Sequence, residues 1–220
     1  VVGISIVGIS QIIPGLTLAR MIKEKYPHLH ITLGGPIFSV NAGQLIGHPE
    51  FFDDFCHSVV TFEGEEPMHR LLSALKAGDS LSTVPNLLHL DGREVVQNKE
   101  RVELRFEELP HPDFDGLPMD KYLSPYPILP VLQSRGCYWG KCTFCTHSFV
   151  YGHRYGKQKT QAMVDELEKL MKKYNTKYFT FSDEAVSPHS LNDVSEEMIE
   201  RGVEICSLAL LKFEKVMDEE

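Results

Sequence analysis

The feature that most constrains the fold is the alternation of short apolar runs with amphipathic helical segments, which recurs in both halves of the chain. Val1 to Val7 is a nearly continuous β-branched run, a helical pattern opening at Pro14 follows it, and the run HITL then leads into Gly34-Gly35-Pro36. A strand, a helix and a second strand in this order form a βαβ unit with parallel strands. A continuous apolar run is typical of a strand buried on both faces of such a sheet. We therefore predict that the chain begins within a parallel α/β sheet, with Leu18, Ile22 and Tyr26 on one face of the first helix.

The same alternation continues as far as a proline-rich connector. The sequence predicts a strand over Ser58 to Phe62, a helix from about Pro67 to Ala77 and a hairpin over Asn86 to Val96. Six prolines then fall between Leu109 and Pro130, and this density excludes a regular helix or a central strand. We place the domain boundary in this connector.

A second alternating pattern follows the connector. We expect a strand over Pro130 to Arg135, a helix with Thr160 as its N-cap, a strand over Lys177 to Ser182, a helix ending at Gly202 and a strand over Val203 to Leu211. Such an alternation builds a parallel barrel, whose chemistry lies at the carboxyl ends of the strands. The expected organisation is an α/β domain over residues 1–80, a hairpin and connector over 81–129, and the first part of a barrel over 130–220.

Composition narrows the classes of protein to which the chain can belong. With 220 residues, of which 42% are hydrophobic, it can bury the cores of two small domains. Its net charge of -9 argues against nucleic acid as a partner, because phosphate binding requires a basic surface. No apolar run reaches the length of a membrane span and the start lacks a charged signal-peptide region, so we expect a cytoplasmic protein that does not bind a membrane.

Three of the five cysteines lie within nine residues, which points to a metal in a reducing compartment instead of a disulfide framework. Cys137, Cys142 and Cys145 have the spacing C-x4-C-x2-C, and Gly136 and Gly140 allow the backbone to bend so that the thiolates converge. A structural zinc or an electron-transfer cluster normally takes four protein ligands. Three thiolates therefore leave one metal position open for a substrate, which indicates chemistry.

The residues alone leave other interpretations of this loop open. His147 follows Cys145 by two residues, so a non-catalytic Cys3His zinc site or electron-transfer module is the main alternative, and three unrelated buried thiols are another. Analysis of bound iron, sulfide and zinc separates these classes. Cys56 and Cys206 lie in apolar surroundings, and we expect both to be small core residues.

The cysteine loop resembles the cluster loop of the radical S-adenosylmethionine (SAM) enzymes, in which three cysteines hold a [4Fe-4S] cluster and SAM chelates the fourth iron. The usual spacing in that family is C-x3-C-x2-C, and this chain has one extra residue in the first gap. The segments SRGCYWGKCTFC and FSDEAVSP are most similar to radical SAM proteins that carry a cobalamin-binding domain in front of the barrel. The resemblance covers nearly the whole chain, and the cysteine loop is its most specific part.

The resemblance implies which residues contact SAM. In the family the aromatic residue before the last cysteine lies against the adenine, and Phe144 has this position. An ordinary core phenylalanine is the alternative, and the match of position favours the contact with SAM. An acidic, glycine-containing segment after the second barrel strand binds the SAM amino group in the family. Asp183 and Glu184 have this place in the sequence SDEA, which lacks the glycines. Either carboxylate is expected to bind SAM, and a solvated pair at a helix start is the alternative.

The resemblance also implies cobalamin binding in the first domain. A serine strand like VGIS and a glycine pair like LGGP lie along the nucleotide tail in the domains it resembles, so Ser5, Gly34 and Gly35 are expected cobalamin contacts. Tight strand-to-helix turns would explain the same residues. No D-x-H-x-x-G is present, and His28 and His30 are expected at the surface, not on cobalt. We expect a fragment truncated at both ends, whose cobalamin binding is weak without the upstream strands.

Taken as a whole, the resemblance implies a partial flavodoxin-like, cobalamin-binding-type parallel sheet followed by the first strands of a radical SAM partial (β/α) barrel. The implied cofactors are a [4Fe-4S] cluster, SAM and cobalamin. The implied activity is reductive cleavage of SAM to start radical chemistry, leading to methyl transfer to an unactivated carbon or phosphorus or to a related cyclisation. A small-molecule or peptide substrate and an electron donor such as flavodoxin or ferredoxin are the implied partners, and the fragment alone need not be active.

Overall fold

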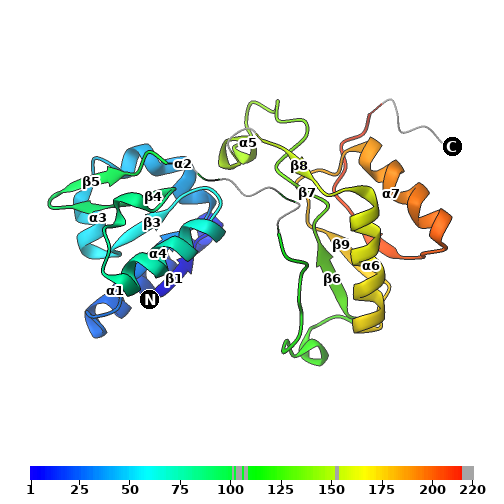
Figure 1. Ribbon diagram of the computed structural model, residues 1–220, viewed down its shortest axis with the longest axis horizontal. Helices are drawn as coiled ribbons and strands as arrows, with labels where there is room; N and C mark the ends of the chain where they lie inside the picture. Colours follow the sequence, from blue (N-terminus) through cyan, green and yellow to red (C-terminus); the bar gives the residue numbers. More distant parts are fainter. Residues whose placement is uncertain (101, 103–105, 107–108, 152–153, 215–220) are drawn as a thin grey trace. The chain divides into compact units, whose positions relative to one another are not determined.

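The computed structural model describes the whole chain except residues 101, 103–105, 107–108, 152–153 and 215–220. The chain forms two compact units, Val1–Leu104 and Arg105–Glu220, and each has its own hydrophobic core. Figure 1 shows both units, with most of their helices and strands labelled. Among the described residues, no helix combines the length and the apolar character that crossing a membrane requires.

The first unit contains a five-stranded sheet in the order β1-β2-β3-β4-β5. Its first three strands, β1 (Val2–Ser5), β2 (Ile31–Gly34) and β3 (Ser58–Val60), are parallel, as the βαβ pattern predicted. The hairpin of β4 (Leu87–Asp91) and β5 (Glu94–Gln97) adds antiparallel to β3. The predicted hairpin therefore forms, and it extends the sheet of the first unit.

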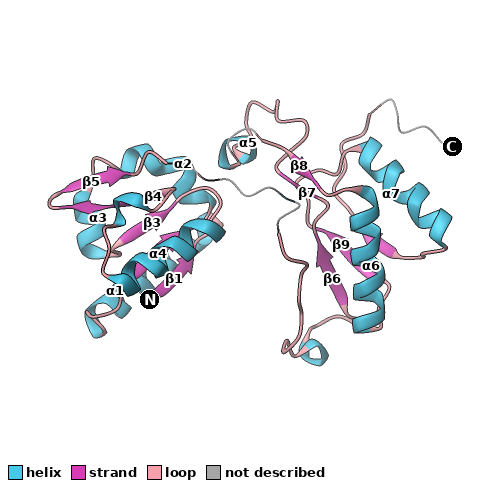
Figure 2. Ribbon diagram, viewed as in Figure 1, coloured by secondary structure: helices cyan, strands magenta, loops and turns pink. Residues whose placement is uncertain are grey.

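Helices cover both faces of this sheet, as Figure 2 shows. They are α1 (Ile12–Lys25), α2 (Pro36–Leu45), α3 (Pro49–Asp54) and α4 (Glu65–Ala77). Side chains from α1, α2 and α3 pack with Leu33 and Val59 in one cluster, whereas α4 packs with Val60 and Leu87 in another. Because successive strand residues point to opposite faces, the neighbours Val59 and Val60 belong to different clusters.

Two predictions about the start of the chain were wrong. The strand β1 forms, but it lies at the sheet edge and is not buried on both faces: Val7 is 62% exposed, and only Ile6 of this run is buried. The helix α1 begins at Ile12, before Pro14, and buries Ala19. Of the face predicted for it, Ile22 packs against the core, whereas Leu18 is 49% and Tyr26 42% exposed. Apolar residues lie nearly all round this helix, so the sequence pattern does not identify the face that packs.

The second unit contains a three-stranded parallel sheet in the order β10-β9-β6. Its strands are β6 (Ile128–Val131), β9 (Tyr178–Phe181) and β10 (Cys206–Leu208). A separate antiparallel pair joins β7 (Ser134–Arg135) to β8 (Gly156–Lys157). The single strand that we predicted over Pro130 to Arg135 is therefore two short strands in different sheets.

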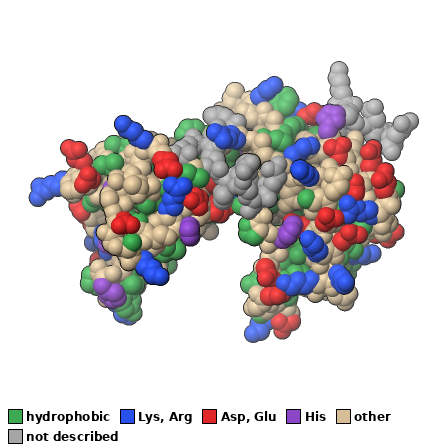
Figure 3. All heavy atoms as spheres, viewed as in Figure 1, with side chains coloured by type: hydrophobic (Ala, Val, Ile, Leu, Met, Phe, Trp, Pro, Cys, Tyr) green, Lys and Arg blue, Asp and Glu red, His purple; other side chains and the backbone are tan. Residues whose placement is uncertain are grey.

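Two long helices, α6 (Thr160–Tyr174) and α7 (Pro188–Arg201), pack on this parallel sheet. Lys159, not Thr160, is the N-cap residue of α6, whereas α7 ends at Gly202 as predicted. Acidic and basic side chains are interspersed on the face of this unit seen in Figure 3. One ion pair of this unit joins the Arg201 guanidinium to Glu197 at 2.6 Å. The alternation of strands and helices predicted for this half is confirmed.

The proline-rich connector belongs to the second unit and runs as irregular chain with one short 3-10 helix, Met119–Lys121. His111 Nδ1 lies 2.7 Å from the buried Glu166 Oε2 of α6, and the Tyr174 hydroxyl accepts a 2.8 Å bond from the Phe114 backbone N–H. The Phe114 ring also meets Tyr174 edge-on. The connector is thus fastened to α6 by side chains instead of by regular secondary structure.

Candidate functional site

The cysteine loop connects β7 to the short helix α5 (His147–Val150) of the second unit. Gly136 has φ of 88°, and a Cβ there would overlap the Arg154 carbonyl oxygen, so only glycine fits where the loop begins. Gly140 also has a positive φ, 57°, between the first two cysteines. Both glycines therefore bend the loop, as the sequence predicted.

The three loop cysteines are free thiols. Cys137 and Cys145 are partly buried, and Cys142 is exposed. No group of three or more His, Cys, Asp or Glu side chains surrounds a single metal position in the described part of the chain. The donor chemistry of the loop suits a cluster, although the ligand set itself stays a prediction.

The other two cysteines differ from each other. Cys56 is buried in the core of the first unit, where burial raises the pKa of its thiol to about 12. The prediction of a core cysteine was correct there but wrong for Cys206, which is exposed on β10, an edge strand of its sheet. Cys206 is therefore a free, exposed thiol outside the loop.

Asp183, after the end of β9, holds the base of the cysteine loop. Its buried carboxylate accepts hydrogen bonds from the Gln133 backbone N–H at 3.1 Å, the Ser134 backbone N–H at 2.6 Å and the Ser134 hydroxyl at 2.5 Å. Burial raises the pKa of Asp183, and these bonds oppose that rise. Since its oxygens are occupied by the chain, Asp183 has the geometry of a positioning group, not of a free acceptor for SAM.

Glu184, the next residue, has a different environment. Its side chain is 29% exposed, and Oε1 lies 3.1 Å from His147 Nδ1 of α5. This pair joins the carboxyl end of β9 to the residues that follow the last cysteine of the loop. Phe144 is 89% exposed, which excludes the alternative of a core phenylalanine. Glu184 and Phe144 are thus accessible, whereas Asp183 is not.

Two contacts to the cysteine loop were not predicted from the sequence. The Tyr138 hydroxyl donates to Glu214 Oε1 at 2.9 Å, and the Lys212 ammonium lies 3.7 Å from the centroid of the Trp139 ring. Burial and then the Glu214 bond raise the pKa of Tyr138 to about 12, so the hydroxyl stays protonated. Two adjacent aromatic residues in a glycine-flanked loop were the only signal in the sequence.

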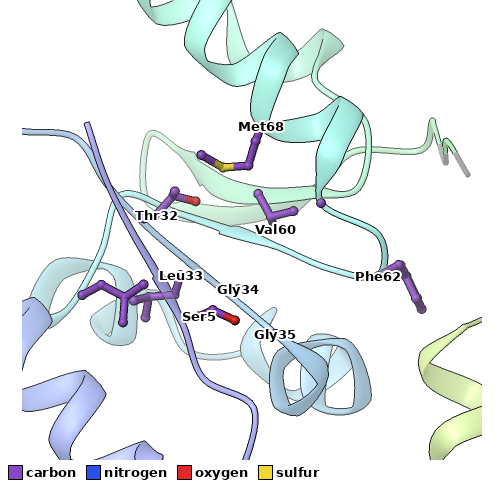
Figure 4. A pocket seen from close by; sticks show the side chains of 11 residues that line it. Ser5, Thr32, Leu33, Gly34, Gly35, Val60, Phe62 and Met68 are labelled. Atoms are coloured by element: carbon purple, nitrogen blue, oxygen red, sulfur yellow. The ribbon is translucent and has the colours of Figure 1, made fainter. Parts of the chain in front are cut away.

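The residues predicted for cobalamin gather at one pocket of the first unit. Ser5, Gly34 and Gly35 line a pocket of about 330 Å³ at the carboxyl ends of β1 and β2. Figure 4 shows Ser5 and Thr32 on the strands and Met68 hanging from α4 above them. Segments far apart in the sequence thus meet where the fold predicts a ligand.

The two glycines of this pocket serve different purposes. Gly35 has φ of 110°, and a Cβ there would overlap the Ile6 carbonyl oxygen, so the turn itself requires glycine. A Cβ on Gly34 would lie no closer than 3.5 Å to any described atom, the Val60 carbonyl oxygen. Gly34 is therefore not required by packing, and its missing side chain leaves space in the pocket.

Thr32 is a pocket residue that the sequence analysis missed. It is 2% exposed, and its Oγ1 has no hydrogen-bond partner among the described residues. A buried hydroxyl without a partner costs free energy, which a bound ligand would recover. Thr32 and Gly34 are two residues apart on β2 and therefore share a face of the sheet, which is the signal in the sequence that could have identified Thr32.

No family model matches the chain, but comparison with known proteins gives sequence relatives. An uncharacterized methyltransferase of Pyrococcus horikoshii is 28% identical over 193 residues, 86% of this chain and 41% of the relative. The anaerobic magnesium-protoporphyrin IX monomethyl ester cyclase of Cereibacter sphaeroides is 26% identical over 210 residues, 90% of this chain and 33% of the relative.

Solved structures cover both units. The cobalamin-dependent S-adenosylmethionine radical enzyme OxsB with aqua-cobalamin bound matches 94% of this chain with a TM-score of 0.72 and 23% identity. The radical S-adenosylmethionine methyltransferase TsrM of Kitasatospora setae, with cobalamin and a [4Fe-4S] cluster bound, matches 97% with a TM-score of 0.65 and 18% identity. The chain has the fold of cobalamin-dependent radical SAM enzymes.

This fold confirms the predicted architecture of a cobalamin-binding-type sheet followed by the first strands of a radical SAM barrel. The chain spans less than half the length of these proteins: 41% and 33% of the two sequence relatives, and 30% and 45% of the OxsB and TsrM chains. Barrels of parallel strands place their chemistry at the carboxyl ends of the strands, and Glu184 lies shortly after the carboxyl end of β9.

Proposed function

We propose that this chain is part of a radical SAM enzyme whose [4Fe-4S] cluster is held by Cys137, Cys142 and Cys145. The observation that carries the proposal is a glycine-bent loop with three free thiols at the carboxyl ends of the strands, in a unit with the radical SAM fold. The cluster, when bound, supplies the electron that starts radical chemistry on SAM. The second unit positions the thiolates, because Asp183 fastens the start of the loop to the sheet.

We propose that Glu184 and Phe144 contact SAM. An accessible carboxylate suits the SAM ammonium, and an exposed aromatic face suits its adenine. Of the two carboxylates predicted for this role, Glu184 is favoured, because Asp183 already accepts three hydrogen bonds from the chain. In the structure the His147 imidazole is paired with the Glu184 carboxylate. The SAM ammonium would replace this imidazole as the partner of Glu184.

We further propose that the pocket of the first unit takes the nucleotide tail of cobalamin, with Ser5 and Gly34 at its wall and the Thr32 hydroxyl as a hydrogen-bonding group. Gly35 lines the same pocket and shapes its turn. The reaction class is methyl transfer to an unactivated carbon or phosphorus, or cyclisation, because the relatives named above are methyltransferases and a cyclase. A small-molecule or peptide substrate, a flavodoxin- or ferredoxin-type electron donor and a reducing cytoplasmic location complete the proposal.

The decisive experiment is anaerobic reconstitution with iron and sulfide, followed by metal analysis. We expect iron and sulfide without zinc, and loss of the brown chromophore in Cys137→Ala, Cys142→Ala and Cys145→Ala. Cys206→Ala is the matched control, because this thiol is exposed but lies outside the loop. Zinc in place of iron, or equal iron in wild type and Cys142→Ala, would refute the cluster.

SAM binding is tested in protein that carries the reconstituted cluster. Glu184→Gln should weaken SAM binding more than the control substitution Ser124→Ala.

Cobalamin binding is tested separately by retention of hydroxocobalamin. Gly34→Leu should abolish retention, because the new side chain is tolerated by the backbone and fills the pocket. Gly43→Leu is the control, since no described atom lies within 4 Å of a Cβ at that position of α2. If the wild-type protein retains hydroxocobalamin and both variants retain as much as it does, this pocket is removed from the proposal and the cluster is untouched.

A further inference from the structure

The segment that follows β10 lies against the first half of the cysteine loop. Leu211 forms a parallel β-bridge with Val186, and the Val186 backbone N–H donates to the Leu210 carbonyl at 2.9 Å. These bonds place the next residues of the chain, up to Glu214, beside the loop. The backbone is thus fixed at Leu210 and Leu211, directly before the residues that reach the loop.

Two side chains of this segment hold two adjacent loop residues. Glu214 Oε1 accepts the Tyr138 hydroxyl at 2.9 Å and lies 3.0 Å from the Lys212 ammonium. The same ammonium lies 3.7 Å from the centroid of the Trp139 ring, well within cation–π range. Tyr138, Glu214, Lys212 and Trp139 thus form one connected set, which we call the 212–214 clamp.

The clamp acts on the part of the loop between its first two cysteines. Tyr138 and Trp139 lie between Cys137 and Cys142, and the next residue, Gly140, has a positive φ. Beyond the clamp, Gly140 is held by a long 3.4 Å bond from the Ser148 hydroxyl to its carbonyl oxygen. Fixing two large side chains therefore restricts the separation of the first two thiols.

We propose that Lys212 and Glu214 are positioning residues that keep the first gap of the cysteine loop in the conformation that retains the cluster. This inference rests on the proposed function for its consequence, but the clamp itself is defined by contacts within the chain. Neither residue touches a cysteine in the described contacts, so their effect passes through Tyr138 and Trp139.

Trp139 is the single tryptophan of the chain, so its fluorescence reports the clamp without any cluster. In cluster-free protein, Lys212→Met and Glu214→Gln should make Trp139 more accessible to acrylamide. Lys212→Arg should behave like wild type, because it keeps a cation over the ring.

In reconstituted protein, Lys212→Met and Glu214→Gln should lose the visible cluster absorbance to an iron chelator roughly tenfold faster than wild type, the factor expected for one charge-assisted contact. Lys177→Met, an exposed lysine at the opposite end of the same sheet, is the control for both measurements.

Each outcome decides the inference. Unchanged quenching in Lys212→Met and Glu214→Gln would show that the clamp does not form in solution. Changed quenching with an unchanged rate of cluster loss would show that the clamp does not serve the cluster. If wild type itself takes up no iron and sulfide, the proposed function fails and the clamp's role in retention fails with it, whereas the quenching data still report whether the contacts exist.

Discussion

At the scale of single residues, the site depends on buried polar groups that the chain itself satisfies. Asp183 shows this most clearly, because its carboxylate is 2% exposed yet accepts three hydrogen bonds from Gln133 and Ser134. Burial without partners would cost far more than these bonds contribute net. The start of the cysteine loop is thereby attached to the end of β9.

Ser134→Ala should lower the free energy of unfolding of the second unit by about 1–3 kcal/mol, because it removes a hydrogen bond to a buried carboxylate. The measurement is urea unfolding followed by circular dichroism. Ser124→Ala is the matched control: its hydroxyl also donates one bond, to the Tyr126 carbonyl oxygen, but at an exposed position. Equal effects of the two substitutions would contradict a structural role for the Asp183 network.

A pair of histidines makes the first unit sensitive to acid. His30 was expected at the surface, but it is partly buried, with Nε2 2.9 Å from the Ser58 hydroxyl and its ring 5.1 Å from that of His57. Burial, and then the neighbouring His57, lower the pKa of His30 from 6.5 to about 4. The unfolded chain therefore binds a proton in a pH range where the folded unit resists it.

Consequently the stability of the first unit should be complete above pH 6.5 and should decrease as the pH falls toward 4. Urea unfolding at several pH values measures this slope. His30→Gln should flatten it, whereas His48→Gln should not, because His48 is exposed and paired with Glu50 at the surface. A slope that is the same in wild type and His30→Gln would assign the pH dependence to other groups.

At the scale of elements, side-chain contacts with α6 hold the proline-rich connector in place. Glu166 is 2% exposed in the middle of that helix, and its Oε2 lies 2.7 Å from His111 Nδ1 and accepts a 3.3 Å bond from the Gln158 side chain. Further along, Phe114 and Asp113 contact Tyr174. A buried carboxylate on the packed face of an amphipathic helix is thus used as an attachment point for irregular chain.

Glu166→Gln should detach the start of the connector, because the uncharged amide loses its charge-assisted bond to His111. Limited proteolysis should then cut residues 109–127 several-fold faster than in wild type, with the cleavage sites identified by mass spectrometry. Glu168→Gln is the control on the same helix, since Glu168 lies on the exposed face and pairs with Arg201. Unchanged proteolysis in Glu166→Gln would mean that Phe114 and Tyr174 suffice to hold the connector.

At the scale of the whole molecule, the chain consists of two units with separate cores. The residues of the cobalamin pocket all come from the first unit, and the cysteine loop with its supporting contacts comes from the second. Each proposed cofactor therefore has its binding residues within one unit. The two assignments can be tested independently for this reason.

A protein comprising residues 1–104 should fold by itself, because the five-stranded sheet and both of its helix-packed clusters lie within that range. We expect a cooperative thermal transition by circular dichroism and dispersed amide signals by NMR. A matching protein that ends at residue 80 should not fold cooperatively, because it lacks β4 and β5. Equal cooperativity of the two would show that the hairpin is dispensable for the sheet.

Much of the architecture follows from local patterns in the sequence. The periodicity of apolar residues, the cap at Gly202 and the glycines at Gly136 and Gly140 depend on a few neighbouring residues, so the sequence predicted them. The failures have a common origin in long-range packing. The residues of β1 do not determine that it lies at the sheet edge, and the residues of α1 do not determine which of its faces is buried. Both depend on the strands and helices that pack beside them.

For the site, the sequence by itself determined the chemical types: three thiols in one bent loop, a carboxylate pair after a strand, and small residues at two strand ends. Only the tertiary structure distinguished the two carboxylates: Asp183 is hydrogen-bonded by the chain itself, whereas Glu184 stays accessible. It also brought Lys212 and Glu214 to the loop across more than seventy residues, and it left Thr32 without a partner in the pocket. The physical reason is that residue type sets what a side chain can bind, whereas burial and the partners supplied by distant segments decide whether that capacity is already used.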